Sequence, residues 1–215
     1  EGGLVICDDE TLAEKSLCLS DQAVPFNPIN KDKFTKITPF VGMSMRVSEI
    51  SGAMLRVQLK KIDKILEEHK VRKNLLVETL KSNSFYGSAF DLVEAHDPDG
   101  QTYSTYHLQF KDPEKALLVS KKLMAEKIVV IPLTMKVAHS VWKWNQYLKK
   151  GRFYSTNRDP YENTDKKYTF LKIYFIPTLE ILMRTISGEM DITMSLEEVK
   201  SHGESISKAI SEVLS

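Results

Sequence analysis

The segment from residue 41 to residue 66 constrains the fold more than any other part of the chain, because it joins a polar loop led by glycine to a long amphipathic pattern. From about Val47 onward, apolar residues recur with a period close to 3.6, at Ile50, Met54, Val57, Ile62, Ile65, Leu66, Val71, Leu75, Leu76 and Leu80. The pattern predicts a helix of more than roughly thirty residues with a break near His69. A helix of that length in a mixed α/β chain is typical of a connection between two bodies.

The composition excludes several classes of protein. With 215 residues and 42% hydrophobic content, the chain can bury a substantial core. Its 30 basic and 29 acidic residues nearly cancel, so no overall field attracts nucleic acid or an anionic membrane. No apolar run approaches the roughly eighteen residues of a membrane span, and the start has no signal-peptide pattern. We therefore predict a cytoplasmic protein without nucleic-acid or membrane partners.

No residue pattern indicates a metal site. Cys7 and Cys18 are the only cysteines, and their positions suit buried reduced thiols better than a disulfide framework. The five histidines are scattered without the spacing of metal ligands. Phosphate-binding glycine loops and nucleophile elbows are also absent from the sequence.

Local signals predict the order of the elements. Leu4 to Cys7 is typical of a buried strand, and Asp8-Asp9 can cap a helix that runs to about Leu19. Beyond Ser82 the pattern predicts a small α+β domain. Its expected elements are strands at 91–95, 103–110, 128–131 and 190–194 and a helix at 113–126. A last helix reaches Leu214, and Ser195 and Glu198 form the capping box at its start. Asp97-Pro98-Asp99-Gly100 predicts a turn that joins the first two strands as a hairpin.

Three segments hold candidate binding residues. Ser44 and Arg46 precede the long helix, where free N–H groups favour an anion such as phosphate. Alternatively, Ser44 or Ser48 could cap the helix. Arg46 would then pair with Glu49 or face solvent. Residues 136–168 interleave eight basic residues and three acids with aromatic side chains, which suits a sugar or base but also a solvated surface. Arg184 interrupts an apolar run, and its partner could be an internal Glu or a substrate carboxylate.

Two motifs resemble a known family. Residues 2–14 resemble the segment that follows the cofactor lysine in DegT/StrS-type sugar aminotransferases, which runs Gly-Glu-Gly-Gly, a strand, Asp-Asp-Glu and Leu-Ala. Residues 42–53 and 58–63 resemble the same family's Gly-x-Asn-x-Arg-Met-Ser-Glu, Ala-Ala and Gln-Leu-x-x-Leu-Asp pattern. Residues 139–148 and 184–187 are similar to the branch that aminates an octulosonate sugar acid of lipopolysaccharide cores.

The resemblance implies an α/β and α+β chain with the fold of aspartate aminotransferase (fold type I). Residues 1–40 would be the end of a large domain that binds pyridoxal 5'-phosphate, 41–82 a connecting loop and helix, and 83–215 a small α+β domain. The family forms homodimers. Its Schiff-base lysine and the acid beside the pyridinium nitrogen would fall before Glu1, so we expect no catalytic residue within the 215 and no catalysis by this chain alone.

The same resemblance assigns site residues. Ser44 stands where family members have an Asn that reaches the cofactor phosphate of the other subunit, and the shorter side chain is a departure from that pattern. Ser44 and Arg46 would bind the cofactor. His139, Trp142, Trp144 and Arg184 would bind the sugar.

The implied function is transfer of an amino group, from glutamate, to a keto or aldehyde sugar or nucleotide sugar in cell-surface polysaccharide or lipopolysaccharide biosynthesis. Two alternatives stay open. A deoxysugar dehydratase of the same family, dependent on pyridoxamine phosphate, differs by a His at the lysine position. A non-catalytic carbohydrate-binding module would use the aromatic and basic stretch alone.

Overall fold

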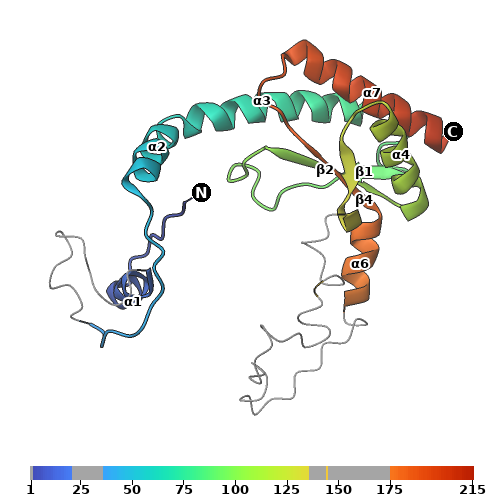
Figure 1. Cartoon of the computed structure of the whole chain (residues 1–215). Helices are drawn as coiled ribbons and strands as arrows, with labels where there is room; N and C mark the ends of the chain where they lie inside the picture. Colours follow the sequence, from blue (N-terminus) through green and yellow to red (C-terminus); the bar gives the residue numbers. More distant parts are fainter. Residues whose placement is uncertain (1, 21–35, 136–143, 145–174) are drawn as a thin grey trace. The chain divides into compact units, whose positions relative to one another are not determined.

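The computed structural model describes residues 2–20, 36–135, 144 and 175–215, and the chain divides into two compact units, residues 1–63 and 64–215 (Figure 1). None of the helices in these described residues combines the length and the apolar character that a membrane span requires. The same residues contain no group of three or more His, Cys, Asp or Glu side chains that could hold a metal ion. The predicted domain boundaries, after residue 40 and after residue 82, stay predictions.

The first unit begins with an extended segment and helix α1, Glu10–Ser20. Asp9 caps α1 as predicted, because its Oδ1 accepts a hydrogen bond of 2.8 Å from the N–H of Leu12. The strand predicted at Leu4 to Cys7 is wrong: Leu4, Val5 and Ile6 are 80%, 72% and 84% exposed and belong to no strand. A strand needs a neighbour for its backbone groups, and the described part of this unit offers none to the segment.

The long helical pattern folds as two helices, α2 at Glu49–Leu59 and α3 at Ile62–Lys81. The break predicted near His69 is wrong, since it lies at Lys60 and Lys61 and His69 is inside α3. The N–H of Lys61 donates to the carbonyl of Gln58 at 2.9 Å, three residues back instead of four, which closes the end of α2 as a turn. Sequence periodicity does not report such a local change because the apolar stripe continues through it.

The second unit is built on an antiparallel sheet of four strands in the order β1-β2-β4-β3. The strands are β1 at Phe90–Leu92, β2 at Thr105–Phe110, β3 at Val130–Pro132 and β4 at Thr185–Glu189. The predicted hairpin is confirmed, with Leu92 opposite Leu108. Its turn is confirmed too, because Asp97 Oδ1 accepts the N–H groups of Asp99 and Gly100, each at 3.1 Å.

The strand predicted at residues 190–194 is wrong, because the fourth strand is β4, five residues earlier. Residues 191–194 instead form a turn in which Asp191 Oδ1 accepts the N–H of Thr193 at 2.8 Å. β4 lies between β2 and β3, so both of its backbone edges are paired. Gly188 is required there: a Cβ on it would lie 2.2 Å from Cζ of Tyr106 on the neighbouring strand.

Three helices cover one face of this sheet: α3, α4 at Pro113–Ala125 and α7 at Leu196–Leu214. The capping box of α7 is confirmed, with Ser195 Oγ accepting from the N–H of Glu198 and Glu198 Oε2 from that of Ser195. Short helices η2 at Leu133–Met135 and α6 at Ile176–Met183 were not predicted. The core consists of Leu76, Leu80, Phe90, Tyr106, Leu108, Phe110, Ala116, Val119, Leu123, Val130, Ile186, Met190, Val199, Ile206, Ala209 and Ile210.

Candidate functional site

The loop that carries Ser44 and Arg46 is held against the end of α1. A Cβ on Gly42 would lie 2.4 Å from the carbonyl oxygen of Cys18 and 2.5 Å from that of Leu19, so only glycine fits at this close approach. The N–H of Met43 donates to Leu19 O at 2.7 Å, and the N–H of Met45 donates to Ser20 O at 2.9 Å. These bonds satisfy carbonyls that lack a partner at the end of a helix.

Cys18 adds a second link between α1 and the segment before the loop. Its thiol is fully buried, donates to the carbonyl of Phe40 and accepts from the N–H of Phe40, each at 3.2 Å. Cys7 and Cys18 are both free thiols, as predicted, although Cys7 is only half-buried. The role of Cys18 is therefore structural: it helps to fix where Ser44 and Arg46 stand.

Ser44 and Arg46 are both exposed, two residues apart on this loop. The cap of α2 is Ser48, whose Oγ accepts from the N–H of Ser51 at 3.1 Å, and Glu49 lies in the first turn. The capping alternative therefore holds for Ser48 and not for Ser44. The loop carries the hydroxyl of Ser44 and the guanidinium of Arg46, and both groups are chemically suited to binding phosphate.

Arg184 caps the C-terminus of α6 and directly precedes β4. Its carbonyl accepts the N–H of Phe110 at 2.8 Å, which extends the β2–β4 ladder. The side chain is half-buried, and its Nε is buried without a hydrogen-bond partner among the described residues. No described carboxylate forms an ion pair with Arg184, so an internal Glu partner is not found there.

A polar pair on the other face of the sheet was missed by sequence reasoning. His107 of β2 lies directly opposite Ser187 of β4. Ser187 is 3% exposed, and its hydroxyl has no hydrogen-bond partner within the described ranges. Side chains in β2 alternate between the two faces of the sheet, and Tyr106 and Leu108 face the core. This alternation could have placed His107 on the opposite face.

The candidate residues fall in different parts of the chain. Ser44 and Arg46 belong to the first unit, and Arg184 belongs to the second. Trp144 is half-buried. His139 and Trp142 lie outside the described residues.

Comparison with known proteins assigns the chain to a family. A family model described as the DegT/DnrJ/EryC1/StrS aminotransferase family matches residues 1–159. The chain belongs to this family. The predicted resemblance to this family is thus confirmed, and the match includes both the loop of residues 42–46 and the start of the second unit. The octulosonate branch stays a prediction.

Solved structures show the same fold. A sugar-aminotransferase-like protein from Streptococcus pneumoniae matches in its PMP form with a TM-score of 0.62 and 16% identity, over 99% of this chain and 46% of that one. Its apo form matches with a TM-score of 0.57 at 16% identity, again over 99% and 46%. A 3-amino-5-hydroxybenzoic acid synthase matches with a TM-score of 0.60 at 14% identity, over 95% of this chain and 48% of that one.

These matches confirm the predicted fold class: a mixed α/β chain with a small antiparallel sheet, which corresponds to part of a sugar-aminotransferase fold. The chain spans about half the length of the solved structures that it matches.

Proposed function

We propose that the protein carrying this chain is a pyridoxal-phosphate-dependent aminotransferase that moves an amino group from glutamate to a keto or aldehyde sugar, free or nucleotide-linked, in the cytoplasm. The product would enter cell-surface polysaccharide or lipopolysaccharide biosynthesis. The observation that carries the proposal is the family match over residues 1–159, which includes the loop of Ser44 and Arg46.

Ser44 and Arg46 would hold the phosphate of the cofactor. The Ser44 hydroxyl can donate one hydrogen bond, and the Arg46 guanidinium supplies a positive charge with several donors. Both residues fit this role because they are exposed on a loop that Gly42, Met43 and Met45 fix to α1. We propose that they reach the cofactor of a partner subunit in a homodimer.

The cofactor, when bound, supplies a ring that withdraws electrons from the carbon bearing the amino group. No residue among the 215 is assigned the role of the cofactor lysine in this proposal. The chain's own part is to position the phosphate and the substrate, which is the larger share of what a protein adds to cofactor chemistry.

Arg184 supports a sugar acid as the substrate. A buried guanidinium nitrogen without a partner is costly, and a carboxylate on the substrate would remove that cost with a charge-assisted bond. This is the reason to prefer an octulosonate-type sugar acid within the class. We propose that His139, Trp142 and Trp144 contact the same sugar through stacking and hydrogen bonds.

The test uses the protein as cells produce it, purified with its cofactor. Adding glutamate should convert the pyridoxal absorbance to that of the pyridoxamine form and release one 2-oxoglutarate per cofactor, and an octulosonate keto sugar should reverse the change. A protein that binds cofactor but forms no borohydride-stable link to a lysine would be the dehydratase. A protein that binds the sugar but no cofactor would instead be a non-catalytic carbohydrate-binding module.

A further inference from the structure

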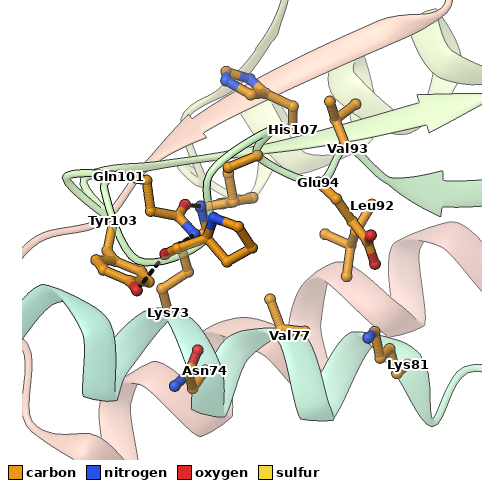
Figure 2. A pocket seen from close by; sticks show the side chains of 13 residues that line it. Lys73, Asn74, Val77, Lys81, Leu92, Val93, Glu94, Gln101, Tyr103 and His107 are labelled. Carbon is orange, nitrogen blue, oxygen red and sulfur yellow. Dashed lines mark hydrogen bonds between the residues drawn. The ribbon is translucent and has the colours of Figure 1, made fainter.

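A cavity of about 340 Å³ lies in the second unit, between α3 and the loop that joins β1 to β2 (Figure 2). Lys73, Val77 and Lys81 contribute one wall from α3, and Leu92, Glu94 and Tyr103 contribute to the other. The volume lies at the lower end of the range for small-molecule sites. None of the candidate residues discussed for the cofactor or the sugar lines it.

Lys73 places a half-buried ammonium at one end of this cavity. Its Nζ donates to Oε1 of Gln101 at 2.7 Å and lies 5.8 Å from the centre of the Tyr103 ring. The ring is held in place because Tyr103 is 8% exposed and its hydroxyl donates to the carbonyl of Pro98 at 2.5 Å (Figure 2). Lys73 is therefore fixed in position before any ligand arrives.

Both described partners of Lys73 are neutral. No carboxylate in the described part of the chain forms an ion pair with it, and burial lowers the pKa of the Lys73 ammonium. A charge removed from water is costly unless an opposite charge accompanies it. An amide oxygen and a ring face compensate only part of that cost. An anion in the cavity would supply the rest of this compensation.

The rest of the cavity determines what kind of anion fits. Val77 and Leu92 supply apolar surface between α3 and the strand side (Figure 2). Lys81 and Glu94 lie toward the other end, so the walls carry two ammonium groups against one carboxylate. An inorganic anion would leave the apolar surface uncovered, whereas an organic anion would fill both parts.

We propose that this cavity binds a small organic carboxylate whose charged group pairs with Lys73 and whose apolar body packs on Val77 and Leu92. The proposal goes beyond the aminotransferase function and does not depend on it, because every residue it uses lies between 73 and 103 and the test requires no cofactor.

The probe is 3-phenylpropanoate, titrated into the full 215-residue chain and followed by two-dimensional amide NMR. Saturable shifts should appear at the amides of residues 73–77 and 92–103. The alcohol 3-phenylpropan-1-ol keeps the apolar body without the charge, and acetate keeps the charge without the body. Each should bind at least about tenfold more weakly, the loss expected when a charge-assisted bond or the apolar burial is removed.

Two variants and a matched control complete the test. Lys73→Gln should weaken 3-phenylpropanoate binding about tenfold. Lys70→Gln removes the same charge from a lysine that lies 5.7 Å from the same Tyr103 ring but does not line the cavity, and it should bind as the parent does. Val77→Trp should block the cavity and abolish binding, with the thermal midpoint used to confirm folding.

Absence of saturable shifts would overturn the proposal. So would equal affinity for the alcohol and the carboxylate, or equal loss in Lys70→Gln and Lys73→Gln, because either result would indicate non-specific association. If Lys73→Gln does not fold, unchanged binding by a folded Val77→Trp is sufficient to reject the site.

Discussion

The hydroxyl of Tyr106 lies 2.9 Å from Nε2 of His202, and this bond joins the inner strand β2 to α7 within the second unit. The two rings meet edge-on, with centroids 6.2 Å apart and an interplanar angle of 80°. Tyr106 is 1% exposed, and its ring lies against Gly188, where no Cβ fits. This polar bond acts together with the apolar packing of α7 and with the hydrogen bonds from the buried Asn83 amide to Ser207 and Ser211 of the same helix.

Tyr106→Phe should destabilise the second unit by about 1 kcal/mol, because the ring is kept but Nε2 of the half-buried His202 loses its partner. Urea unfolding measures the change. A double-mutant cycle with His202→Phe is the control: the cost of Tyr106→Phe should shrink when both polar groups are gone. Additive costs would show that the bond contributes nothing of its own.

The stability of the second unit should fall as the pH drops below about 6.5. Burial lowers the pKa of His202, so the unfolded chain takes up a proton at this residue before the folded chain does, and protonation favours unfolding. Above the unfolded pKa neither state is protonated and the contribution is constant. The free energy of unfolding, measured between pH 7 and pH 5, should slope less in His202→Gln. The pKa is also lowered for the carboxyl groups of Glu68, Asp191, Glu198 and Glu212, and their protonation affects stability mainly below this pH range.

Ser195→Ala should cost about 1 kcal/mol of stability, because the N–H of Glu198 at the start of α7 loses its acceptor. Ser205→Ala is the matched control on the same helix, where the hydroxyl only bonds back to Ser201 O. That change should be neutral or slightly stabilising. Chemical denaturation of both variants gives the comparison, and equal effects would mean that the cap is unimportant.

Gly42→Ala should release the loop of Ser44 and Arg46 from α1, because the added Cβ would clash with two backbone carbonyls that can move only if the backbone moves. Hydrogen exchange at the amides of Met43 and Met45 should accelerate. Gly52→Ala is the control: nothing lies within 4 Å of its Cβ, so the change should stabilise α2 by about 0.5–1 kcal/mol. Unchanged exchange in Gly42→Ala would contradict the docking.

Arg184→Ala should raise the KM for a sugar-acid substrate at least about tenfold if the proposed carboxylate contact is made. Arg184→Lys should recover part of the loss, since it keeps the charge but not the paired donors. A neutral sugar analogue without the carboxylate is the control substrate. Equal losses with both substrates would assign Arg184 a structural role instead.

Much of the fold could be predicted because many elements are specified by neighbouring residues. Asp9 before α1, and Ser195 with Glu198 at the start of α7, act through bonds to backbone groups within three residues. Pro113 starts α4 through its own fixed backbone angle. The turn at Asp97 is equally local. Such signals can be recognised in a single sequence because their energies do not depend on contacts with distant residues.

The candidate site was predicted less completely. The family motifs identified Ser44 and Arg46, but the cap at Ser48 and the docking on α1 required coordinates. His107, Ser187 and the cavity at Lys73 were not found, because each depends on residues brought together by strand pairing or by a helix packed on a loop.

The sequence by itself determined where most helices begin, which turn makes the hairpin and which family the chain belongs to. Only the tertiary structure decided which apolar runs become strands. Leu4, Val5 and Ile6 stay exposed, while Thr185–Glu189, with its Ser and Gly, is an inner strand. The physical reason is that a helix satisfies its backbone hydrogen bonds internally, whereas a strand exists only when another strand supplies them.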